Sequence, residues 1–253
     1  ITCRDWFQLC LKEGLTVFRD QQFSGDMRSA AVKRIEDVLT LRARQFREDQ
    51  GPLAHPVRPE SFVEINNFYT ATVYEKGAEV IGMLKRLVGD DGYARALDLY
   101  FARHDGQAAT IEDWLKVFED ATGRDLAQFK RWYSQAGTPR LKVSDDWADG
   151  TYTLHLEQVN PPTPGQAQKD PKVIPVAVGL LNPNGDEVVP TTVLELTEGR
   201  QSFRFEGLAA KPVPSILRGF SAPVVLERAA SAEERAFLLA HDTDPFNKWE
   251  AGR

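Results

Sequence analysis

Two short stretches of the sequence hold residues whose types and spacing could support catalysis. The first is Leu11–Asp20, where Glu13 lies among leucine, valine and phenylalanine residues at helical spacing. A buried carboxylate needs a partner, and a metal ion is one of the few adequate partners. A solvated glutamate on the outer face of a helix is the alternative, because Glu is rarely buried. The residues alone leave both interpretations open.

The second stretch is Glu64–Gly77, which combines Asn66 and Asn67 with two tyrosines, Tyr69 and Tyr74. A tyrosine hydroxyl can donate a hydrogen bond to an oxyanion that develops during acyl transfer. The same tyrosines could equally be core aromatics whose hydroxyls reach water. No glycine-rich phosphate loop or G-x-S-x-G elbow is present, and the four histidines have no metal-ligand spacing among themselves. The sequence therefore predicts no self-contained zinc site.

Composition excludes several classes of function. The chain has 253 residues, of which 42% are hydrophobic, and a net charge of -6, so it can bury a core in one or two domains. Its acidity and lack of basic runs argue against nucleic-acid binding. No apolar run approaches about 18 residues, so no membrane span is expected. The two cysteines, Cys3 and Cys10, cannot form a disulfide framework and indicate a reducing, cytoplasmic compartment.

Helical spacing dominates the first half of the chain and would position both stretches. It predicts helices over Asp5–Val17, 26–45, 73–88 with a stop at Gly89, and 93–103, followed by helices capped by Thr110 and by Asp125. Gly14 falls inside the first helix, where glycine costs about 1 kcal/mol against alanine and usually indicates close packing.

Strand spacing begins after Pro139 and continues for about 90 residues with regular turn signals, which is typical of a β-sandwich. Asn184-Gly185 marks a hairpin, because this pair supplies positive φ cheaply. Helical character resumes at Ser231. We therefore predict a multi-domain α+β chain with domains at residues 1–138 (helical), 139–229 (β-sandwich) and 230–253 (the first helices of a further helical domain).

Three segments resemble the bacterial aminopeptidase N family, the zinc aminopeptidases of the gluzincin class. Cys3–Asp20 resembles the family segment with the third zinc ligand, Val73–Val80 the segment with the catalytic tyrosine, and Arg131–Pro139 the junction between the catalytic and β domains. The similarity runs through essentially all 253 residues. It implies that residues 1–138 are the helical C-terminal half of a gluzincin catalytic domain.

The resemblance also implies roles for individual residues. Glu13 would be the third zinc ligand, and Tyr74 would donate its hydroxyl to the oxyanion of the tetrahedral intermediate. Asn66, Tyr69 and Glu75 match positions near the substrate pocket. Chemistry alone, rather than the match, suggests Asp20 as a residue that supports the ligand sphere, because it lies seven residues beyond Glu13 on the same helix face.

One departure from the family limits what this chain can do. The family's H-E-x-x-H motif, which supplies two zinc ligands and the general base, is absent from these 253 residues. We therefore expect a fragment that is inactive by itself, cut from an enzyme that acts on peptides with a free N-terminus and completed by the missing upstream segment. The alternatives are a non-catalytic helical and β-sandwich module that binds a peptide or protein partner, and a degenerate homologue that kept the fold but lost the metal.

Overall fold

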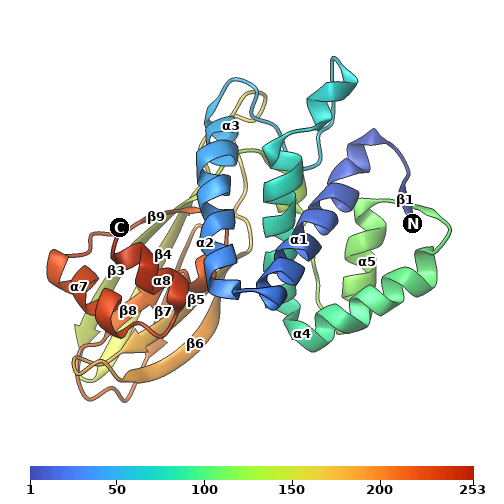
Figure 1. The fold of residues 1–253 in the computed structure, drawn as a ribbon. Coiled ribbons are helices and arrows are strands. Elements are labelled where there is room, and N and C mark those ends of the chain that lie inside the picture. Colours follow the sequence, from blue (N-terminus) through green and yellow to red (C-terminus); the bar gives the residue numbers. More distant parts are fainter. The chain divides into compact units, whose positions relative to one another are not determined.

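The computed structural model describes all residues 1–253. The chain forms two compact units, one made of residues 1–138 and 161–172 and the other of residues 139–160 and 173–253. The first unit is helical and the second consists mainly of β-strands with two helices at its end (Figure 1). No helix is both long enough and apolar enough to cross a membrane.

Six helices build the first unit. Helix α1 packs against α2 and α4, and α4 packs against α5 (Figure 1). A short parallel pair of strands joins the N-terminus to the segment before α5. The elements are α1 (Leu9–Met27), α2 (Ala30–Thr40), α3 (Phe46–Gln50), α4 (Gly77–His104), α5 (Ile111–Thr122), α6 (Arg131–Ser134), β1 (Thr2–Cys3) and β2 (Ala108–Ala109).

Local signals explain most of these helix boundaries. Thr110 and Asp113 form the predicted capping box at the start of α5. Gly89 has φ +75° and interrupts the helical backbone within α4, as the predicted stop at this residue requires. The first predicted helix is wrong in its limits: Asp5 caps a 3-10 turn, and α1 begins only at Leu9.

Two further boundaries also differ from expectation. The predicted helix over residues 26–45 is wrong at its start, because α1 continues to Met27 and Ser29 then caps α2 by accepting from Val32 N. Asp125 does not cap a long helix. Its carboxylate accepts from Ala127 N in a turn that precedes the single helical turn α6. Residues 41–45 and 72–76 are π-helices, an uncommon form that occurs frequently at functional sites.

Two sheets form the second unit. One has the strand order β7-β4-β3-β9 and the other β6-β5-β8. Strand β4 alternates buried and half-exposed residues, whereas every residue of β5 is buried. The strands are β3 (Arg140–Ala148), β4 (Thr151–Val159), β5 (Ile174–Leu181), β6 (Glu187–Leu196), β7 (Arg200–Phe205), β8 (Val213–Ile216) and β9 (Val225–Glu227).

The predicted turns and the final helices are present in this unit. The turn with Gly185 at φ +95° joins β5 to its antiparallel neighbour β6. Ser231 caps α7 (Ala232–His241), and Asp244 caps α8 (Pro245–Ala251). These helices belong to the same compact unit as the strands. The domain limits at residues 138 and 229 stay a prediction.

Candidate active site

The candidate site lies where α1 crosses the start of α4. The two backbones touch at a pair of glycines: a Cβ added to Gly14 would lie 2.9 Å from the carbonyl carbon of Gly77, and one added to Gly77 would lie 3.2 Å from Gly14 Cα. Glycine allows this approach because it has no side chain to separate the helices. The close packing that Gly14 indicated is therefore real, and its partner is Gly77.

This crossing brings Glu13 and Tyr74 together from segments that are far apart in the sequence. Glu13 precedes Gly14 on α1, and Tyr74 lies in the π-helix Thr72–Lys76 that leads directly into α4. The Glu13 carboxylate lies close enough to the Tyr74 phenol to influence its ionisation. Burial, the Glu13 carboxylate and neighbouring Tyr69 all raise the pKa of Tyr74. The phenol therefore keeps its proton at neutral pH and can donate it in a hydrogen bond.

Glu13 is the residue whose chemistry suits a metal. Its side chain is only 13% exposed, and its carboxylate lies 3.0 Å from the ammonium of Lys12, whose side chain is 65% exposed. A carboxylate oxygen is an ordinary zinc donor. However, no group of three or more His, Cys, Asp or Glu side chains in the chain could hold an ion. These residues therefore offer no complete ligand set around Glu13.

An aromatic wall borders the pair. The Tyr69 and Tyr74 ring centroids are 6.4 Å apart, and Trp6 continues the row at 6.4 Å from Tyr69 and 6.2 Å from Phe68. Tyr69 and Trp6 remain 52% and 45% exposed. Exposed aromatic rings beside a polar pair give a surface that can receive an apolar side chain.

The other predicted substrate residues lie in two different settings. Asn66 sits in the 3-10 turn Ile65–Phe68, where its amide donates to Glu64, and it lines a groove of about 900 Å³ together with Phe68. Glu75 follows Tyr74 in the chain, but its carboxylate faces Arg44 at 3.5 Å. Burial raises the pKa of Glu75. The structure thus groups Tyr69 with Glu13 and Tyr74, and directs Glu75 elsewhere.

Asp20 is not brought to this site. It is an exposed residue near the middle of α1, and seven residues of helix separate it from Glu13 by about 10 Å along the axis. A side chain that supports a metal ligand must reach it by a hydrogen bond. Asp20 shares the helix face of Glu13, as expected, but not its immediate surroundings.

Several contributors to the site were not predicted from the residues. Trp6 has no predicted role, although it forms part of the wall beside Tyr69. Glu48, from α3, was not singled out, although its carboxylate accepts hydrogen bonds from the start of the Tyr74 segment. Neither residue carries a motif. Their exposure and contacts depend on how distant segments pack, which periodicity does not specify.

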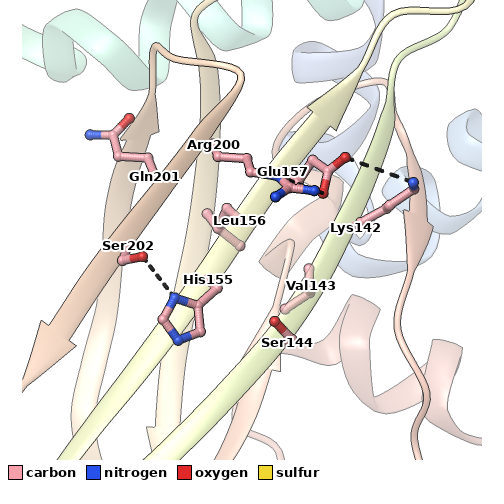
Figure 2. A pocket seen from close by; sticks show the side chains of 9 residues that line it. All are labelled: Lys142, Val143, Ser144, His155, Leu156, Glu157, Arg200, Gln201 and Ser202. Atoms are coloured by element: carbon pink, nitrogen blue, oxygen red, sulfur yellow. Dashed lines mark hydrogen bonds and ion pairs between the residues drawn. The ribbon is translucent and has the colours of Figure 1, made fainter.

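A second polar cluster lies on the β7-β4-β3 sheet, in a hollow of about 400 Å³ (Figure 2). The His155 ring contacts Ser202 Oγ at 2.7 Å through Nδ1 and Asp146 at 2.9 Å through Nε2. Serine, histidine and aspartate are also the residue types of a hydrolase triad. His155 and Ser202 lie opposite each other in the strand register, so their contact follows from strand pairing. The Asp146 side chain is 80% exposed, so water screens it. This cluster is a surface network.

Family models match most of the chain. A family model described as the peptidase family M1 domain matches residues 1–133, and a model described as a domain of unknown function with an Ig-like fold matches residues 137–229. The chain is 49% identical to aminopeptidase N of Escherichia coli and 55% identical to aminopeptidase N of Caulobacter vibrioides, over 100% of this chain and 30% of each relative.

A solved aminopeptidase structure is also similar to this chain. Aminopeptidase A of Legionella pneumophila in complex with aspartic acid superposes with a TM-score of 0.84 at 31% identity, covering 99% of this chain and 27% of that chain. The chain thus spans about 30% of the length of the curated relatives that it matches. The M1 model matches more than half of the chain, and the order of a helical unit and an Ig-like β unit agrees with this match. The chain belongs to peptidase family M1.

Proposed function

We propose that this chain is part of a zinc-dependent aminopeptidase that releases N-terminal amino acids from peptides. The observation that carries the proposal is the crossing at Gly14 and Gly77, which sets a largely buried carboxylate against a tyrosine hydroxyl. The names of the relatives, aminopeptidase N, support the same activity. A non-catalytic module is less well supported, because a scaffold has no need of a carboxylate held against a phenol at an open aromatic wall.

Glu13 would hold the metal as one of three protein ligands. The chain has no cluster that could supply the other two, and it spans about 30% of its relatives, so those ligands and the general base would come from outside these 253 residues. Zinc, when bound, supplies a water molecule of lowered pKa as nucleophile. Lys12 would have to leave or share the Glu13 oxygen that it contacts. The chain alone would be inactive.

Tyr74 would act on the substrate carbonyl. As the scissile carbonyl gains negative charge, a phenol that is protonated and fixed nearby can donate a hydrogen bond to that oxygen. The close contact of α1 with the start of α4 supports this role, because it places the phenol near the carboxylate of the proposed ligand. Donors placed where charge develops act mainly in the transition state, so they affect turnover more than binding.

Substrate contacts are proposed for Tyr69, Asn66 and Glu75. The exposed Tyr69 ring beside Tyr74 would pack on the substrate, and Asn66 would act from the rim of the neighbouring groove. Glu75 would need to exchange its contact with Arg44 to reach a free amine. Asp20 would support the ligand sphere only through residues outside this chain. The two free cysteines support a cytoplasmic location.

Replacement of Tyr74 tests the proposal. In the complete zinc-loaded enzyme, Tyr74→Phe removes one hydroxyl and is expected to lower kcat by about 10²–10³-fold. Zinc content should stay at the wild-type value, because Tyr74 is not a ligand. Hydrolysis of alanyl-anilide and metal analysis on the same samples provide both readouts. Tyr100→Phe, at a buried tyrosine of α4, is the matched control and should leave kcat unchanged. Wild-type turnover in Tyr74→Phe would refute the oxyanion role.

A further inference from the structure

The π-helix that carries Tyr74 is only partly capped by its own neighbouring residues. The first backbone N–H groups of a helix lack partners within the helix and need acceptors from elsewhere. Here the residue before the π-helix, Ala71, makes no side-chain cap. Thr70 Oγ1 accepts from Val73 N, which leaves the N–H groups of Ala71 and Thr72 to be satisfied by another segment.

Glu48 satisfies both of these groups from α3. Its Oε1 accepts from Ala71 N at 3.1 Å, and its Oε2 accepts from Thr72 N at 2.9 Å. Oε2 also accepts from the Thr72 hydroxyl at 2.8 Å. A carboxylate at the N-terminus of a helix is further favoured by the helix dipole. One side chain, 23 and 24 residues away in sequence, thus makes three hydrogen bonds to the start of the Tyr74 segment.

Neighbours of Glu48 contact the rest of the same π-helix. Gln45 donates to the Thr72 hydroxyl, and Asp49 forms a fully buried ion pair of 2.7 Å with Lys76. Residues 48 and 49 lie three and four positions after residue 45, so all three share one face of the helix, and this face contacts the Tyr74 segment. The ends of the π-helix are held at Thr72 and Lys76, and Tyr74 lies between them.

We infer that Glu48 is a positioning residue for Tyr74: its carboxylate fixes the start of the π-helix and thereby the place of the phenol beside Glu13. This inference rests on the proposed function of Tyr74. Glutamine cannot replace Glu48, because its amide has one acceptor oxygen for two N–H groups, and its NH₂ would meet a second donor. A small displacement of a catalytic group can cost up to 10²-fold in rate.

A double-mutant cycle in the complete zinc-loaded enzyme tests the inference. Glu48→Gln is expected to lower kcat about tenfold or more, with KM and zinc content unchanged. In a Tyr74→Phe background the same substitution should cause no further loss, because Glu48 acts through the hydroxyl already removed. Glu48→Asp keeps the charge but shortens the reach, and should give a smaller loss. Glu36→Gln, an exposed glutamate on α2, is the matched control and should leave kcat unchanged.

The outcomes separate this inference from the proposed function. An equal fold-loss from Glu48→Gln in both backgrounds, with a lower Tm, would mean that Glu48 only stabilises the fold, and would overturn the inference. Unchanged kcat in Glu48→Gln, with kcat lost in Tyr74→Phe, would overturn the inference alone. Unchanged kcat in Tyr74→Phe would overturn the proposed function itself. Glu48→Gln could also lower Tm. If it then lowers kcat in the enzyme that keeps Tyr74 but not in the Tyr74→Phe enzyme, the result would still support positioning.

Discussion

At the scale of single residues, charged side chains of the first unit form ion pairs with residues that are remote in sequence. Glu112 is an example away from the candidate site: Arg58 contacts it at 2.5 Å and Lys130 at 2.8 Å. Partial burial opposes its ionisation, but the hydrogen bonds from Lys130 and Arg58 outweigh this and lower the pKa of Glu112 to about 2. The folded chain therefore holds this carboxylate ionised to lower pH than the unfolded chain does.

This shift predicts how stability depends on pH. A group whose folded pKa lies below its unfolded value stabilises the fold above the unfolded pKa, here 4.5, and loses that contribution as pH falls towards about 2. Because the side chain is 45% exposed, water screens the pair, and about 1 kcal/mol is expected at pH 7.

Urea unfolding of the complete chain checks this expectation. Glu112→Gln should lower the free energy of unfolding at pH 7 by about 1 kcal/mol, and the difference from wild type should shrink steadily between pH 5 and pH 2. Glu36→Gln, on the exposed side of α2, should show no such pH-dependent difference. A Glu112→Gln deficit that is constant across this pH range would contradict the electrostatic explanation.

At the scale of elements, the α1–α4 crossing decides whether Glu13 and Tyr74 meet. Gly14→Ala would place a Cβ 2.9 Å from backbone that cannot move aside, so α1 must shift. We expect a loss of about 1–3 kcal/mol in the free energy of unfolding. Gly82→Ala is a matched control at the same interface, because its Cβ would lie 3.5 Å from the Phe18 ring, an ordinary contact.

Chemical denaturation of both variants measures the difference. Alanine has the higher helix propensity by about 1 kcal/mol, so Gly82→Ala should be neutral or slightly stabilising while Gly14→Ala destabilises. Equal stability of the two variants would show that the glycine contact does not limit the approach of the helices.

Elements also show what a single sequence can and cannot predict. Periodicity and caps located the change from helices to strands after Pro139, the Thr110 cap and the break at Gly89, because these signals are local. Gly14 indicated close packing, but nothing in the sequence named Gly77 as its partner. The π-helix over residues 72–76 was missed, since the acceptor for its first N–H groups is the remote side chain of Glu48. The pairing of Glu13 with Tyr74 needed the resemblance to a family, and its geometry needed the structure.

At the scale of the whole molecule, the chain has a helical unit with one proposed metal ligand and one proposed oxyanion donor, and a β unit of Ig-like fold. The remaining ligands would come from outside these residues, in keeping with a chain that spans about 30% of its relatives. The proposed site therefore depends on Glu13, since Tyr74 and Glu48 take their proposed roles from their places around it.

Zinc content of the Glu13→Ala variant of the complete enzyme shows whether Glu13 is a metal ligand. With the wild-type enzyme as reference, we expect Glu13→Ala to lose its zinc after dialysis, because one of three protein ligands is gone. Asp20→Ala, on the same face of α1 but exposed, is the matched control and should keep wild-type zinc. Wild-type zinc content in Glu13→Ala would contradict the assignment of Glu13 as a ligand, and with it the proposed site.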